Sequence, residues 1–313
     1  FVWHAVRATV SFERYAVRPN RRMKWALTGV AVSAALVLAG CTPAQQRGFL
    51  PEGSTNATEH TPGITSLWVN SWIVLLGVGL ITWGLILWAT IAYRRRKGQT
   101  GLPVQLRYNM PIETFFTVVP VLLIVAFFGF TAQEMSKIEA RYDNPENVVE
   151  VIGKRWSWDF NYLNDDVYFQ GVQVQTDDNG SAIAETMPVL YLPVDKKTEI
   201  RIETRDVIHS FWIVEFLYKK DMIPGQTNYM SVTPTQTGTY MGKCAELCGE
   251  YHSMMLFEVR VVEQDEYDAY VKAQREAGHE GRIGLEYNPL QEEYFGDEAK
   301  SQNEDHFETP AKA

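Results

Sequence analysis

Two long apolar runs interrupt an otherwise mixed sequence. Residues 68–93 contain no charged side chain, and a second apolar run covers residues 112–132. Each run is long enough to cross a bilayer core, which takes about 20 residues. Four basic residues at 94–97 follow the first run, and such a cluster marks the cytoplasmic side. The pattern predicts a transmembrane hairpin within residues 64–136, with the C-terminal part on the outer face. A buried core hairpin is the alternative, but the first run is too uniformly apolar for it.

The periodicity changes at residue 147, where apolar and polar residues begin to alternate as strands require. Residues 176–180 read Thr-Asp-Asp-Asn-Gly, which is a hairpin signal. Many short strands predict an all-β sandwich or barrel over residues 137–262. The alternating side chains Trp158, Phe160 and Tyr162 are interpreted as part of its core. Further strand-like runs cover residues 189–194, 198–204, 207–214, 239–243 and 255–262.

The N-terminal part has the pattern of an export signal. Met23 and Lys24 precede an apolar stretch that ends in Leu-Ala-Gly just before Cys41. A charged start, a short apolar core and small residues before the cut mark a secretory signal. The last four residues resemble a bacterial lipobox, which would make Cys41 the lipidated N-terminus and residues 1–40 an upstream segment plus signal peptide. A helix with a chance cysteine is the alternative. Residues 41–63 are interpreted as a linker.

Charge and cysteine content narrow the picture further. The chain of 313 residues carries a net charge of −9, and residues 263–313 contain 14 acidic and 5 basic residues, so this segment alone accounts for the whole imbalance. We expect such an acidic C-terminal tail to be solvated. The sequence has three cysteines and no Cys-x-x-Cys-His pattern, so no covalently attached haem is expected.

Four soft metal donors occur within twelve residues. Cys244, Cys248, His252 and Met255 follow one another at spacings of four, four and three, and His209 lies upstream on a strand-like run. Sulfur and imidazole ligands select copper or zinc, and a thioether adds nothing to a structural zinc site. Copper is therefore favoured, and two ions sharing both sulfurs would use every donor. A disulfide is the other alternative, because paired cysteines are common in exported domains.

The pattern Cys-x3-Cys-x3-His-x2-Met, with an upstream Asp-Val-x-His-Ser, resembles subunit II of haem–copper cytochrome c oxidase. The similarity covers about residues 68–262. It implies a cupredoxin-like Greek-key sandwich after the transmembrane hairpin, and a binuclear copper A centre with two copper ions. The ligands implied by the resemblance are His209, Cys244, Cys248, His252, Met255 and the backbone carbonyl of Glu246.

The resemblance also implies roles for two residues outside the copper loop. Trp156 matches the aromatic residue through which electrons enter, although Ser157 stands where the family usually has tyrosine. Glu113 matches a glutamate at the mouth of a proton pathway, with Phe116 in place of the usual tryptophan. A carboxylate near the end of a span can also simply stay hydrated, whereas an intramembrane acid is by default a candidate for proton transfer.

A magnesium ion is the other metal that the resemblance implies. The side chain of Glu246 would bind it at the interface with subunit I, and Asp221 would support the site. Magnesium is usually held by one or two carboxylates and water. For Asp221 a solvated loop acid is the alternative.

The function implied is that of the electron-accepting subunit of cytochrome c oxidase in a bacterial cell membrane. Its expected partners are oxidase subunits I and III and a cytochrome c. The cytochrome c is either soluble or membrane-bound, the latter including one held in a complex with the cytochrome bc complex. No nucleic-acid partner is expected. Electrons would pass to subunit I, where dioxygen is reduced to water and protons are pumped. The alternatives are a quinol oxidase subunit II, which lacks the copper ligands, and a membrane-anchored copper carrier, which needs neither Glu113 nor Trp156.

Lipidation gives the first testable prediction. Mass spectrometry of the mature N-terminus should find Cys41 carrying a diacylglycerol. A Cys41→Ala variant should stay in the membrane, because two helices bind far more strongly than lipid chains. An unmodified peptide spanning residues 38–44 in the mature protein would refute the lipobox interpretation.

Overall fold

The computed structural model describes residues 28, 42–102 and 107–284. The chain divides into two compact units, residues 1–46 and 47–313. The described part of the first unit contains the short helix α2 (Pro43–Gln46). The predicted signal peptide, the lipidation site at Cys41 and most of the acidic tail lie outside the described residues.

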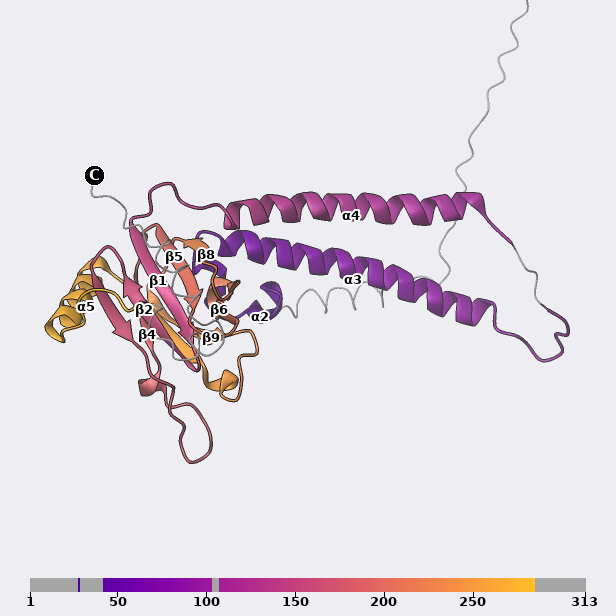
Figure 1. Cartoon of the computed structure of the whole chain (residues 1–313). Helices are drawn as coiled ribbons and strands as arrows, with labels where there is room; N and C mark the ends of the chain where they lie inside the picture. The colour runs from indigo at the N-terminus through magenta and orange to yellow at the C-terminus, as the bar shows by residue number, and fades with distance from the viewer. Residues whose placement is uncertain (1–27, 29–41, 103–106, 285–313) are drawn as a thin grey trace, which may run out of the picture. The chain divides into compact units, whose positions relative to one another are not determined.

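In the second unit, two long helices follow the short 3-10 helix η1 (Ser54–Asn56). Helices α3 (Thr61–Ala92) and α4 (Met110–Ile138) are both long and apolar enough to cross a membrane. They run antiparallel, with Gly63 near the start of α3 beside Glu134 near the end of α4 (Figure 1). Both helices begin before the predicted apolar runs, each with a proline near its N-terminus, where a backbone N–H has no helical partner anyway. Helix α4 also continues past residue 132 to Ile138. Two apolar helices before a β-domain were predicted, and the structure confirms them.

The β-domain consists of two five-stranded sheets that contain parallel as well as antiparallel pairs (Figure 1). The first sheet has the strand order β3-β2-β1-β5-β8, and the second has the order β4-β10-β9-β6-β7. The strands are β1 (Asn147–Lys154), β2 (Ser157–Tyr162), β3 (Val167–Gln170), β4 (Val189–Pro193), β5 (Thr198–Thr204), β6 (His209–Ile213), β7 (Tyr218–Met222), β8 (Asn228–Val232), β9 (Gly238–Cys244) and β10 (Leu256–Val262). The predicted β-sandwich is therefore confirmed.

The core lies between the two sheets and is rich in aromatic side chains. Trp158 packs against Phe257 with ring centroids 5.0 Å apart, and Phe211 stacks on Phe257 at 4.8 Å. Phe160 and Tyr162 are also buried. The interpretation of the alternating aromatic residues as core is confirmed, and their bulk fixes the spacing of the two sheets that carry the site described below.

The predicted hairpin at residues 176–180 forms a turn in the loop between β3 and β4. Asp177 Oδ1 accepts hydrogen bonds from the backbone N–H groups of Asn179 and Ser181. Gly180 has a φ of +79°, which glycine adopts without steric cost. A bridge between Thr176 and Ala182 closes the turn.

The segment after β10 differs from the expected solvated tail. Helix α5 (Gln264–Glu276) buries Tyr267 and Val271 against the β-domain. The chain then crosses the outer side of the first sheet, where Arg282 pairs with the buried carboxylate of Glu150. The ordered domain therefore extends at least to Gly284, because apolar residues at helical spacing anchor an otherwise polar helix.

Truncation tests this boundary. Removing residues 285–313 should leave the stability of the β-domain unchanged, whereas removing residues 263–313 should lower the free energy of unfolding by roughly 3–6 kcal/mol. The estimate counts two lost side chains, Tyr267 and Val271, at about 1.5–3 kcal/mol for each buried apolar side chain. Urea unfolding followed by tryptophan fluorescence measures the difference. Equal stability of the two truncated proteins would show that α5 contributes nothing.

Candidate metal centre

The loop between β9 and β10 is closed by backbone hydrogen bonds. Cys244, the last residue of β9, donates its N–H to the carbonyl of Met255 at 3.0 Å. The next residue, Ala245, donates its N–H to the carbonyl of Ser210 on β6, also at 3.0 Å. These bonds hold both ends of the loop against β6, which begins at His209. Donors that lie 35 residues apart in the sequence are brought together in this way.

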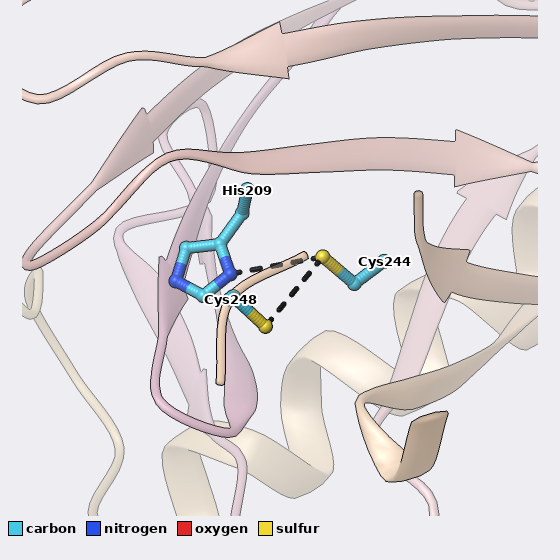
Figure 2. A group of neighbouring side chains, drawn as sticks. All are labelled: His209, Cys244 and Cys248. Carbon is cyan, nitrogen blue, oxygen red and sulfur yellow. Dashed lines mark hydrogen bonds between the residues drawn. The ribbon is translucent and has the colours of Figure 1, made fainter. Parts of the chain in front are cut away.

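Figure 2 shows three of these donors pointing toward one another. Nδ1 of His209 lies 3.7 Å from Sγ of Cys244, and the sulfurs of Cys244 and Cys248 are 3.9 Å apart. The donor atoms of the three residues all lie within 4.8 Å of one another, and all three residues are buried. Such a compact set of soft donors could hold a metal ion.

The other three predicted donors adjoin this group. Nδ1 of His252 lies 3.4 Å from the sulfur of Cys248, and Sδ of Met255 lies 3.7 Å from the same sulfur. The carbonyl oxygen of Glu246 is 3.2 Å from the sulfur of Cys244. The structure therefore brings together all six donors that the resemblance implied, around the two cysteine sulfurs.

The donor set fits copper better than the alternatives. The sulfur–sulfur distance of 3.9 Å is far beyond the length of a disulfide, which is about 2.05 Å. Both sulfurs can reach one ion, since a metal–sulfur bond is about 2.3 Å. A closed zinc site needs four ligands, and this cluster offers six. Thiolates, imidazoles and a thioether together are the ligands that copper prefers.

The two thiols interact directly, and their pKa values shift in opposite directions. The hydrogen bond between the two sulfurs lowers the pKa of Cys244 to about 3. The same bond, together with burial, raises the pKa of Cys248 above that of an ordinary thiol. A metal that binds both sulfurs must therefore displace the Cys248 proton.

Asp206 supports His209 from behind and was missed as a functional residue, although it belongs to the quoted motif. Its Oδ1 lies 2.8 Å from Nε2 of His209, and its Oδ2 accepts the backbone N–H of Arg155 at 2.7 Å. Burial alone would lower the pKa of His209, but the bonds to Asp206 and Cys244 outweigh burial and raise it. A carboxylate on the second nitrogen fixes the ring so that the first nitrogen faces the metal.

Trp156 lies beside the metal-binding loop. Its half-buried indole meets the ring of Tyr251 edge-on, with centroids 5.0 Å apart. Gly249 leaves room for the indole, because a Cβ at that position would lie 3.1 Å from it. Trp158, two residues further along the chain on β2, donates its Nε1–H to the carbonyl of Met255 at 3.4 Å.

The remaining predicted residues lie apart from the sulfur cluster. Asp221 is exposed on β7, opposite Ser210, whose carbonyl accepts the N–H of Ala245. Ser210 of β6 therefore lies between Asp221 and Ala245, which precedes the exposed Glu246. Glu113 lies in the first turn of α4, where its carboxylate accepts the N–H of Asn109 at 2.8 Å. That bond caps the helix, which is a structural role that the sequence pattern did not suggest.

Comparison with known proteins identifies the family of the chain. Residues 147–262 match the family described as cytochrome c oxidase subunit II, periplasmic domain. The probable cytochrome c oxidase subunit 2 of Streptomyces avermitilis is 40% identical over 85% of this chain and 92% of its own length. Cytochrome c oxidase subunit 2 of Mycobacterium tuberculosis is 33% identical over 79% of this chain and 80% of its own length.

Among solved structures, the periplasmic domain of subunit II of cytochrome oxidase from Bradyrhizobium japonicum is 27% identical, with a TM-score of 0.39, and the match covers 44% of this chain and 99% of that one. The sequence relatives align over most of both chains, from the helices to the β-domain. The chain therefore belongs to the cytochrome c oxidase subunit II family.

Proposed function

We propose that this chain accepts electrons from a cytochrome c at a copper A centre and passes them to the haem–copper subunit of the oxidase. The convergence of six donors on two free, buried sulfurs carries the proposal. The two thiolates and the remaining four donors would hold the copper ions. When bound, the copper pair takes up and releases one electron at a time. The proposed ligands are His209, Cys244, Glu246 (through its carbonyl), Cys248, His252 and Met255.

The protein contributes a fixed set of ligands. Backbone bonds close the loop at Cys244 and Met255, and Asp206 holds the ring of His209. Ligands held in this way cannot move far when the charge of the centre changes, so an electron can arrive and leave with little rearrangement. This is the physical use of a rigid, buried site for electron transfer.

Family membership makes the chain a component of an oxidoreductase complex, and the two apolar helices agree with a membrane protein that carries an extracellular domain. We further propose that both helices span the membrane and contact oxidase subunits I and III. Subunit I would then reduce dioxygen and pump protons with the electrons supplied here. The donor set argues against the quinol oxidase alternative, which needs no copper ligands.

Trp156 is the proposed point at which electrons enter. The indole is half-buried and lies over Gly249 and Tyr251 of the loop that carries the proposed ligands. An aromatic ring in this position offers an electronic path from the surface of the domain to the buried sulfurs. A neighbouring Cβ at position 249 would push the indole away from the loop.

Two further roles depend on subunit I. We propose that the carboxylate of Glu246, supported by Asp221, binds a magnesium ion at the interface, and that Glu113 lies at the opening of a proton pathway. The exposure of Glu246 and Asp221 supports the first role, and the position of Glu113 at a helix end supports the second. A structure of the assembled oxidase decides both: a Glu246 side chain directed away from subunit I, or a Glu113 facing lipid, would contradict them.

Ligand variants test the copper centre. The full-length chain should bind two copper ions, and Cys244→Ser or Cys248→Ser should abolish the visible spectrum because each removes a bridging sulfur. Met255→Leu should keep much of the copper and shift its reduction potential, since a thioether is the weakest donor of the set. Met254→Leu, at the neighbouring position, is the control. One copper ion per wild-type chain would contradict the dinuclear centre.

Substitution of Trp156 tests the path of the electron. Trp156→Phe should slow single-turnover reduction of the copper centre by orders of magnitude, while copper content and spectrum stay unchanged. Trp212→Phe serves as the control, because Trp212 lies between Lys219 and Lys243 on the face of β6. An unchanged rate in Trp156→Phe would show that electrons enter elsewhere.

The salt dependence of the wild-type rate adds information on the donor. Salt screens exposed charges over about 8–10 Å. Reduction by a soluble, basic cytochrome c should therefore weaken as salt rises, whereas reduction within a permanent complex should not.

A further inference from the structure

A buried ionic cluster lies on the outer side of the first sheet, next to the turn that carries Trp156. Asp159 is fully buried and Arg205 is 4% exposed. Nη1 of Arg205 lies 2.8 Å from Oδ2 of Asp159, and Nζ of Lys154 lies 2.7 Å from Oδ1. The N–H of Gly171 also binds Oδ1, at 3.0 Å. Charges this deeply buried are tolerated only when they are paired, so the cluster holds its members in fixed positions.

Arg205 lies between the two segments that carry proposed functional residues. Its backbone N–H donates to the carbonyl of Gly153 at 3.0 Å, at the end of β1. Its side chain pairs with Asp159 of β2, so it contacts both strands of the hairpin whose turn contains Trp156. The next residue in the chain is Asp206, which orients His209. A displacement of Arg205 would therefore shift both the Trp156 hairpin and Asp206, the residue that orients His209.

The chain after α5 completes the surroundings of Arg205. We call residues 277–284 the C-terminal strap. Nη2 of Arg205 donates to the carbonyl of Gly284 at 3.0 Å. The strap is fixed in turn by two hydrogen bonds between Ile283 and Asn161, at 2.8 and 3.0 Å. The planar guanidinium thus binds a carboxylate and a carbonyl at once, which the single ammonium group of lysine does not reproduce.

We propose that Arg205 is a positioning residue: anchored by the C-terminal strap, it holds the Trp156 hairpin against the metal-binding loop. The role rests on the proposed function of Trp156 and of the copper ligands. It gives the strap a use in electron transfer besides its contribution to stability. Arg205 touches neither the electron donor nor the metal, and acts through the placement of the indole.

Hydrogen exchange of the full-length chain tests the positioning directly and needs no copper. In Arg205→Lys, amides of residues 153–158 should exchange about tenfold faster, as expected when roughly one charged hydrogen bond no longer holds a local segment closed. Exchange in β9 and β10 should stay at the wild-type rate. Arg201→Met is the control, because Arg201 pairs with Glu199 on the same strand. Equal exchange of residues 153–158 in wild type and Arg205→Lys would overturn the proposal.

A double variant covers the case in which a single substitution prevents folding. Arg205→Met with Asp159→Asn removes both charges of the pair and leaves no unpaired carboxylate. The effects of substituting two partners in one network do not add. The double variant should therefore speed amide exchange of residues 153–158 about as much as Arg205→Lys does. If residues 153–158 of a folded double variant exchanged their amides at the wild-type rate, that would also overturn the proposal.

Electron uptake from a reduced, basic cytochrome c is the second measurement. Arg205→Lys should lower the single-turnover rate about tenfold, within the loss that an ångström-scale misplacement causes, with copper content and spectrum unchanged. An Arg205→Lys rate equal to that of Arg201→Met would contradict the role. A wild-type chain without a dinuclear copper spectrum would instead contradict the proposed function, while hydrogen exchange would still judge the positioning of the hairpin.

Discussion

The closure of the loop between β9 and β10 is the constraint on which the rest of the site depends. The hydrogen bond from Cys244 N–H to the carbonyl of Met255 fixes the two ends of the loop, and the bond from Ala245 to Ser210 ties it to β6. Three donors from the loop and one from β6 then face the two sulfurs without any need to reach across the domain. A buried metal site requires this pre-arrangement. The thiolates and imidazoles must leave water and bind the metal, and they can do so only if they are already held in the right geometry.

The β-sandwich provides the two supports that a loop alone lacks. From the core, Trp158 contacts the loop backbone at Met255 and packs beside His209. From the edge, Asp206 joins His209 to the backbone of Arg155, the residue before Trp156. The imidazole that faces the sulfurs and the indole over the loop are therefore connected through one carboxylate.

The sequence was informative where chemistry or periodicity is local. Four donors within twelve residues predicted the cluster, and period-two alternation predicted β5 with its observed bounds. The strands β3, β7 and β8 were missed. All three lie at sheet edges, and β7 (Tyr-Lys-Lys-Asp-Met) shows little apolar alternation. Helix α5 was missed in an acidic segment, although Tyr267 and Val271 stand one helical turn apart. The roles of Asp206 and Arg205 follow from contacts between distant segments, which no local pattern in a single sequence contains.

The central claim is that two copper ions share one pair of sulfurs and one electron. The most direct test is the electron paramagnetic resonance spectrum of the purified, copper-loaded full-length chain. The account predicts hyperfine structure from two equivalent copper nuclei, because the bridging thiolates spread the unpaired electron evenly over both ions. A spectrum that shows hyperfine structure from a single copper nucleus would contradict it.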